Sequence, residues 1–217
     1  MAANEESDSS TLTARGAATR SRIVNAAAAL IYAHGVDRTS LDAVMAEAGV
    51  SKSQLYHYFA DKDALVLEVI ALQTERVLGA QQPHLGALDS LRALQLWRDA
   101  LVQLNASTGS KGCPLGSLVS ELANDSEAAR KHLAAGFKIW SDSIEGGLTK
   151  MRERGALAAS ANPHELAVAL LSAVQGGLLL SKATQTSRPL EIAIDMAIAH
   201  VARHVSPTSE RSPRKKR

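Results

Sequence analysis

The stretch TSLDAVMAEAGVSKSQLYHYFADKDAL, residues 39–65, decides how the first part of the chain folds. Thr39 and Ser40 carry hydroxyls that can cap the start of a helix, and the short apolar pattern after them stops at Gly49. Ser51 can then cap a second helix. Two short helices joined by a glycine-centred turn predict a helix-turn-helix.

The second of these helices has two different sides. Leu55 and Phe59 are four residues apart, so they share one face and point toward a core. The other side carries hydrogen-bonding and cationic groups, as a helix that reads base edges in the major groove requires. An ordinary amphipathic helix with an incidental polar face would show the same pattern. The exposed candidates are Lys52, Ser53, Gln54, Tyr56 and His57.

Further helices are predicted on both sides of this motif. Apolar residues spaced by three and four predict a helix over residues 14–34, with Gly35 as its C-cap. Asp61 is placed to cap a long fourth helix that leads out of the motif. We therefore predict a three-helix DNA-binding domain over residues 14–62. A polar, acidic arm over residues 1–13 is expected to precede it and to be disordered.

The motif as a whole resembles the DNA-binding signature of the TetR family of bacterial transcriptional regulators. The resemblance covers about the first 70 residues, where that family has its three-helix reader. Two positions depart from the usual pattern, because Met45 replaces a small alanine and Val36 stands where an aromatic residue often occurs. The matching positions are Thr39, Ser40, Ala48, Gly49, Val50, Ser51, Leu55, Tyr56, Tyr58, Phe59, Lys62 and Leu65.

The resemblance implies a double-stranded DNA operator as partner and assigns roles to individual residues. Base edges would be read by Lys52, Ser53 and Gln54. Gln54 would make a bidentate contact to adenine and Lys52 would address guanine, each worth about 1–3 kcal/mol of discrimination. The implied DNA-binding set also includes Arg20, Thr39, Ser40, Ser51, Tyr56, His57 and Lys62, mostly for contacts to phosphate.

The composition predicts that the rest of the chain is all-α as well. Hydrophobic residues make up 46% and charged residues 21% of the 217 residues, and Ala and Leu outweigh short β-branched runs. We predict about nine helices, a helical ligand-binding and dimerisation domain over residues 63–204, and a basic, disordered tail over residues 205–217. The helices of this larger domain are expected near residues 88–107, 114–122, 126–154, 163–183 and 189–204.

Several protein classes are disfavoured by the sequence. The single cysteine, Cys113, permits neither a disulfide framework nor a multi-cysteine zinc site, which suits the bacterial cytoplasm. The polar start shows no signal peptide, and the longest apolar run, over residues 166–180, is shorter than the about 20 residues that a bilayer requires. Nucleophile-elbow, P-loop and dinucleotide-binding motifs are missing, so we predict no enzyme, no cofactor, no metal and no membrane.

The last two predicted helices carry apolar residues on more than one face, which predicts two packing partners for each. One reading is deep burial within a single chain. The other, which we favour, is a four-helix interface between two copies of the chain. For this homodimer interface the candidates are Gly176, Gly177, Ile194, Ile198 and Val201.

The segment GCPLGSLVSEL, residues 112–122, is similar to the corresponding part of LmrA/YxaF-type members of the TetR family. The resemblance implies a repressor released from its operator by a small apolar or aromatic effector. An architectural or activating DNA-binding protein without a sensor remains the alternative, and plain core packing is the alternative for each pocket residue. The pocket candidates are Trp97, Leu101, Cys113, Leu118, Phe137, Trp140, Met151 and Gln175.

Overall fold

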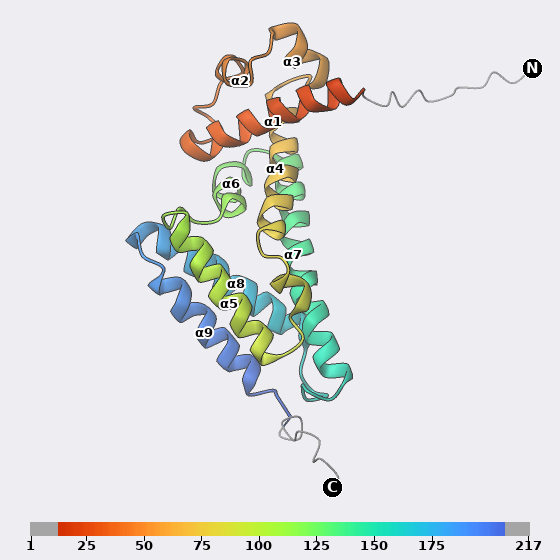
Figure 1. Cartoon of the computed structure of the whole chain (residues 1–217), viewed down its shortest axis with the longest axis vertical. Coiled ribbons are helices and arrows are strands. Elements are labelled where there is room, and N and C mark those ends of the chain that lie inside the picture. The colour runs from red at the N-terminus through yellow and green to blue at the C-terminus, as the bar shows by residue number, and fades with distance from the viewer. Residues whose placement is uncertain (1–12, 207–217) are drawn as a thin grey trace, which may run out of the picture. The chain divides into compact units, whose positions relative to one another are not determined.

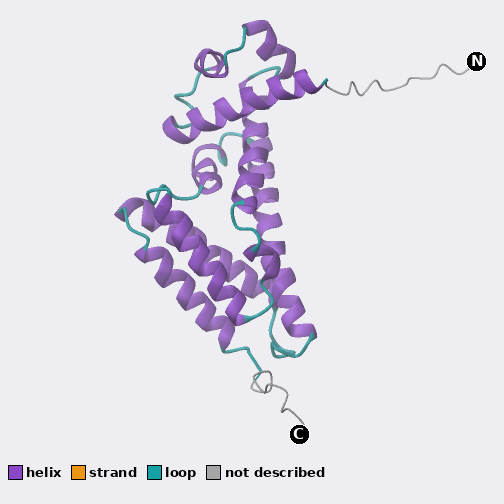
Figure 2. Cartoon of the chain, in the orientation of Figure 1, coloured by secondary structure: helices purple, strands orange, loops and turns teal. Residues whose placement is uncertain are grey.

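The computed structural model describes residues 13–206, which form nine α-helices and one short 3₁₀ helix (Figure 1). Figure 2 shows no strand among these residues, whose only β-type pairing is one isolated bridge. The all-α prediction with about nine helices is confirmed. The predicted arm over residues 1–13 and tail over residues 205–217 lie outside the described residues, apart from their innermost one or two positions.

The chain divides into two compact units between Val69 and Ile70. The first unit contains α1 (Ala14–His34), α2 (Leu41–Ala48), α3 (Lys52–Tyr58) and the beginning of α4 (Lys62–Gly79). The second unit contains the remainder of α4, the 3₁₀ helix η1 (His84–Ala87), α5 (Leu91–Ser107), α6 (Pro114–Leu122), α7 (Glu127–Glu153), α8 (Pro163–Thr184) and α9 (Arg188–Ala202).

The helix ends of the first unit follow from capping chemistry. The Ser40 hydroxyl accepts the backbone N–H of Ala43 at 3.1 Å and starts α2, which ends at Gly49 with φ 63° and ψ 44°. That left-handed conformation favours glycine because it lacks a Cβ. Asp61 accepts the N–H of Ala64 at 2.8 Å at the start of α4, as predicted. The buried core between the helices is formed by Ile23, Ala27, Ile31, Val44, Leu55, Phe59 and Leu65.

In the second unit, α8 packs against both α7 and α9, and α5 packs against α9. Two polar contacts supplement the apolar core. The buried indole of Trp97 donates its Nε1–H to Oε1 of Gln81 at 3.0 Å. The guanidinium of Arg98 on α5 makes two hydrogen bonds of 2.8 Å to the carboxylate of Asp195 on α9. These contacts fix the position of α5 between the preceding segment and α9.

One segment before α5 differs from the prediction. The helix expected to begin near residue 88 begins at Leu91, where the Ser90 hydroxyl accepts the N–H of Ala93. The preceding residues form η1, in which Leu85 and, just after it, Leu88 are buried. This short segment is held in place by the burial of Leu85 and Leu88. It is too short to show a helical periodicity, so the sequence gives no pattern from which η1 could have been predicted.

Most of the residues predicted to form the dimer interface are instead packed inside the chain. The prediction that they contact a partner chain is corrected accordingly. Ile194, Ile198 and Val201 are buried in the second unit. Gly177 faces α9, where a Cβ would lie 2.7 Å from the Cα of Leu190. A close approach between α8 and α9 therefore requires glycine at this position. Among the five candidates, only Gly176 faces open space.

The second apolar side of α8 and α9 remains exposed in the single chain. Leu179 and Leu180 on α8 are 67% and 56% exposed, and Ile192 and Met196 on α9 are 45% and 70% exposed. We refer to these four residues as the free apolar face. Each helix thus has two apolar sides, as predicted, but the side predicted to meet a partner chain is the one buried within the unit.

α8 is the one helix among residues 13–206 whose length and mean hydropathy of 1.6 would suffice to cross a membrane. Nine of its residues, including Leu170 and Val174, are buried within the second unit. Core packing therefore accounts for much of its apolar character.

We predict that Gly177→Ala lowers the free energy of unfolding by about 1–2 kcal/mol, because a Cβ 2.7 Å from the Cα of Leu190 places the cost of overpacking toward the upper end of about 1–3 kcal/mol. The gain in helix propensity, about 1 kcal/mol, offsets only part of that cost. Gly176→Ala is the matched control in open space and should leave stability equal or higher. Urea denaturation of both variants checks this, and equal destabilisation by both would contradict the assigned close approach.

Candidate nucleic-acid interface and ligand groove

The orientation of α3 is fixed from both of its ends. At its start, the Ser51 hydroxyl accepts the N–H of Gln54 at 3.3 Å, and the Gln54 side chain accepts the N–H of Ser51 at 2.9 Å. Toward its end, Leu55 and Phe59 are 0% and 2% exposed. Burial of these two side chains determines which side of the helix faces water.

The water-facing side of α3 carries donors and a cation. The Lys52 ammonium lies 5.9 Å from the ring centroid of Tyr56, a cation–π contact that holds both side chains on the same stripe. The His57 ring meets Tyr58 edge-on at 4.8 Å between centroids. A short helix with this side exposed can enter a major groove and present its N-terminal side chains to base edges. The exposed residues are Lys52, Ser53, Gln54, Tyr56 and His57.

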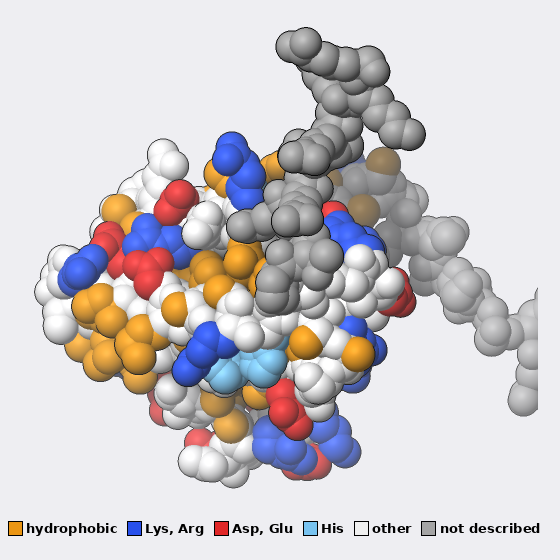
Figure 3. Space-filling model, turned by 90° about the horizontal axis from the view of Figure 1, so that it is seen from below, with side chains coloured by type: hydrophobic (Ala, Val, Ile, Leu, Met, Phe, Trp, Pro, Cys, Tyr) orange, Lys and Arg blue, Asp and Glu red, His pale blue; other side chains and the backbone are white. Residues whose placement is uncertain are grey.

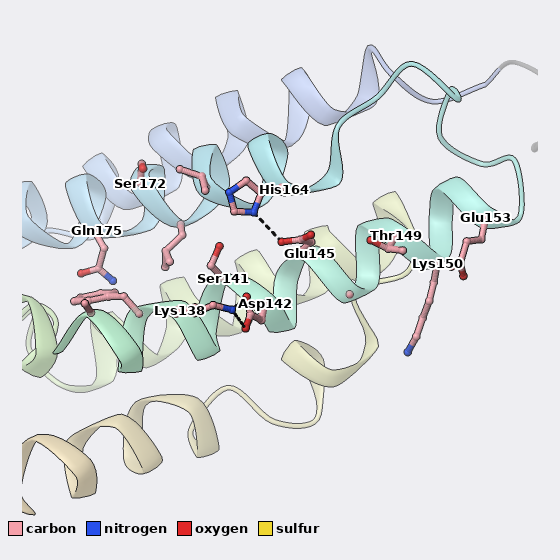
Figure 4. A pocket seen from close by; sticks show the side chains of 15 residues that line it. Lys138, Ser141, Asp142, Glu145, Thr149, Lys150, Glu153, His164, Ser172 and Gln175 are labelled. Carbon is pink, nitrogen blue, oxygen red and sulfur yellow. Dashed lines mark hydrogen bonds and ion pairs between the residues drawn. The ribbon is translucent and has the colours of Figure 1, made fainter. Parts of the chain in front are cut away.

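In the second unit, α7 and α8 form an open groove of about 1100 Å³ (Figure 4). Phe137 on α7 and Val168 and Leu171 on α8 give it an apolar surface. Its polar lining is partly paired, because Lys138 donates to Asp142 at 2.7 Å and Nδ1 of His164 lies 2.9 Å from Oε2 of Glu145. Further lining residues are Ala134, Ser141, Gly146, Thr149, Lys150, Glu153, Ser172 and Gln175.

A smaller cavity of about 440 Å³ lies between α6 and α8. Cys113 and Gln175 both line it, so Gln175 belongs to the groove and to this cavity. Burial raises the pKa of the Cys113 thiol, and nearby hydrogen-bonding groups of Gly116, Gln175 and Leu115 offset that effect only in part. Cys113 is therefore a neutral, buried thiol at physiological pH.

Two polar atoms in the groove lack a partner among the described residues. They are the Oγ of Ser141 and the Nε2 of Gln175, and each is buried. Buried polar groups in folded proteins are nearly always hydrogen-bonded, so such atoms indicate a place that water or a ligand completes.

Comparison with known proteins connects both units with one family. A family model described as bacterial regulatory proteins, tetR family, matches residues 23–69, and one described as transcriptional regulator LmrA/YxaF-like, C-terminal domain, matches residues 91–196. The HTH-type transcriptional regulator YxaF of Bacillus subtilis is 30% identical over 182 residues, which cover 82% of this chain and 92% of that protein. The chain belongs to the TetR family of transcriptional regulators.

Other TetR-family proteins are similar over the same length. An HTH-type transcriptional regulator of Lactococcus lactis is 31% identical over 185 residues, or 82% of this chain and 90% of that protein. The crystal structure of a TetR transcriptional regulator from Chloroflexus aurantiacus shares the fold, with a TM-score of 0.75 at 23% identity and coverage of 89% and 98% of the two chains. These relatives are transcriptional regulators rather than enzymes, and the first unit is a DNA-binding domain.

Three residues predicted to contact DNA from outside α3 have partners within the TetR-type reader itself. Thr39 is buried, and its hydroxyl donates to the carbonyl of Gly35 at 2.8 Å, which corrects its expected role at phosphate. Lys62 donates from Nζ to the carbonyl of Val36 at 2.6 Å. Arg20 pairs with Glu68 and covers the ring of Phe59. These two cations brace the unit, while Ser40 and Ser51 are exposed caps.

Only some of the predicted ligand residues reach a cavity in this TetR-family body. Phe137 lines the α7/α8 groove, Cys113 lines the α6/α8 cavity, and Gln175 lines both. The other candidates line neither of these two cavities and are buried in the core, as the alternative of plain core packing expects. These are Trp97, Leu101, Leu118, Trp140 and Met151.

Two contributions were missed by sequence reasoning. The capping role of Gln54 follows a readable Ser-x-x-Gln signal, in which the third helical residue bonds back to the cap. The groove positions Ser141 and His164 had no such signal. They lie at the polar edges of α7 and α8. The spacing of polar and apolar residues cannot distinguish a polar residue that lines a groove from one that faces bulk solvent.

Gln54 allows helix capping to be separated from base reading. We predict that Gln54→Glu keeps the melting temperature of the chain, because a carboxylate still accepts the N–H of Ser51. The same variant should lose discrimination between specific and random DNA, because the glutamate side chain no longer donates to a base. Gln54→Ala should lose both DNA discrimination and thermal stability, with about 0.5–1 kcal/mol of stability attributable to the missing capping contact. Thermal melts and binding to specific and random DNA check this, and unchanged discrimination in both variants would contradict base reading by Gln54.

Proposed function

We propose that this TetR-family regulator is a cytoplasmic, homodimeric repressor that releases a palindromic operator when a small apolar or aromatic molecule binds its second unit. The observation that carries the proposal is the free apolar face of Leu179, Leu180, Ile192 and Met196. Adjacent exposed apolar side chains of this size mark interaction surfaces on soluble proteins. Figure 3 shows hydrophobic side chains gathered in patches between charged ones on the side seen from below.

A second copy of the chain is the simplest partner for this face. Twofold pairing brings the same side chains of both copies together, which buries each without any additional partner. The same axis relates two copies of α3, so the DNA recognised would be a palindrome with half-sites about one helical turn apart. Gly176 supports this arrangement because it leaves room for close approach beside Leu180.

The effector response is supported by the α7/α8 groove. Its volume of about 1100 Å³ is sufficient for a small organic molecule, and Phe137, Val168 and Leu171 suit an apolar or aromatic one. An effector can lower operator affinity only if it binds the released conformation more tightly than the DNA-bound one. The dense packing around Trp97 and Trp140, which are 0% and 1% exposed, favours the second candidate, a DNA-binding protein without a sensor.

We predict that Met196→Glu converts the dimer to a monomer and weakens operator binding more than tenfold, because a charge is buried at the free apolar face. Leu96→Glu is the matched control, since Leu96 is 44% exposed on α5, outside that face. Light scattering gives the mass, and selection of bound sequences from a random DNA pool gives the operator. A monomeric wild-type protein, or selected sites without twofold symmetry, would contradict the proposal.

A further inference from the structure

The proposed effector site contains a hydrogen-bond donor that has no strong acceptor within the chain. Gln175 lies on α8 where the groove and the α6/α8 cavity meet, and its buried Nε2 has no oxygen or nitrogen acceptor among residues 13–206. The neighbouring thiol of Cys113 is only a weak acceptor. A buried donor without a strong acceptor is energetically unfavourable, and a ligand with a suitable acceptor would recover that cost.

The orientation of the amide indicates where such an acceptor would lie. The Oε1 of Gln175 is turned toward α6, since a Cβ built on Gly116 would lie 3.1 Å from it. Figure 4 shows the nitrogen of the same amide on the side of Ser141, within the groove. The donor thus faces the groove, and the buried hydroxyl of Ser141 offers a second hydrogen-bonding group on the α7 side.

The charges around the groove disfavour an anionic ligand. Its two lysines, Lys138 and Lys150, are outnumbered by the three acids Asp142, Glu145 and Glu153. Lys138 is already paired with Asp142. Lys150 lies at the other end of the groove from Gln175 (Figure 4). A carboxylate bound at Gln175 would therefore lose its hydration without gaining a free cation beside it in the groove, whereas a neutral oxygen needs only the N–H donor.

We propose that the effector is an uncharged molecule with an apolar body and a hydrogen-bond-accepting oxygen, and that Nε2 of Gln175 donates to this oxygen. The inference rests on the proposed effector response and adds the chemical class of the effector and the residue that selects it. The apolar body lies against Phe137, Val168 and Leu171, and the effector oxygen points toward Nε2 of Gln175 on α8.

Three naphthalene probes of nearly equal size test this directly on the full-length protein without DNA. 2-Acetylnaphthalene carries a ketone oxygen, 2-isopropenylnaphthalene replaces that oxygen by a CH₂ group, and 2-naphthoate replaces the ketone by a carboxylate. Titration calorimetry should show the ketone binding at least about tenfold more tightly than the alkene, which corresponds to about 1.4 kcal/mol. The carboxylate should bind more weakly than the ketone.

Substitutions at Gln175 test whether this side chain causes the difference in affinity between the ketone and the alkene. Gln175→Met removes the donor at similar volume and should bring ketone affinity down to that of the alkene while leaving the alkene unchanged. Gln175→Leu also lacks the donor and serves as a second variant if the first fails to fold. Gln103→Met is the matched control, because it makes the same substitution at an exposed position of α5 outside the groove, and it should keep the preference for the ketone.

Equal affinity for ketone and alkene in the wild-type protein, or no ketone binding up to its solubility limit, would overturn the inference. Ketone binding that dissociates the dimer would assign the groove to a second copy of the chain and would also overturn it. Failure of the proposed function gives a different result. A ketone preference that depends on Gln175 but leaves operator affinity unchanged would uphold the binding site and contradict the sensor role.

Discussion

Burial of Leu55 and Phe59 in the core of the first unit is the constraint on which the DNA-reading side depends. A helix of seven residues has too few backbone hydrogen bonds to be stable alone, so its rotation is set by the side chains that it buries. With these two inside, Lys52, Ser53, Tyr56 and His57 face water. The capping box and the internal contacts of Arg20 and Lys62 then reinforce an orientation that burial has already chosen.

In the second unit, the arrangement depends most on α8, because each side of this helix has a different environment. One side fills the core through residues such as Leu170 and Val174, and Gly177 allows α9 to approach closely. A further side lines the groove and the α6/α8 cavity with Gln175, and the remaining one exposes Leu180. An effector bound at Gln175 would therefore act on the same helix that contributes to the proposed dimer interface. The proposed dimerisation and the proposed sensing would then be coupled through this one helix.

The sequence predicted the helices well and their partners less well. Caps such as Ser51 and Gly49 are local signals, so α2 and α3 have the predicted bounds and the TetR-family resemblance is confirmed. A helical pattern cannot state which of two apolar sides faces its own chain. Ile194, predicted at the dimer interface, is therefore found buried within the chain, and Met196 on the other side is exposed. Large apolar residues such as Trp97 looked equally suitable for a pocket or a core. The groove itself depends on the spacing between α7 and α8, which no local pattern encodes.

The account depends most on the proposition that the polar side of α3 contacts bases in duplex DNA. A photo-crosslinking amino acid placed at Ser53 tests this directly, with the same amino acid at Leu96 in the second unit as the control. The account predicts crosslinks from position 53 to bases inside the selected operator, lost when operator competitor is added, and none from position 96. Tight operator binding by the substituted protein with no crosslink from position 53 would contradict it.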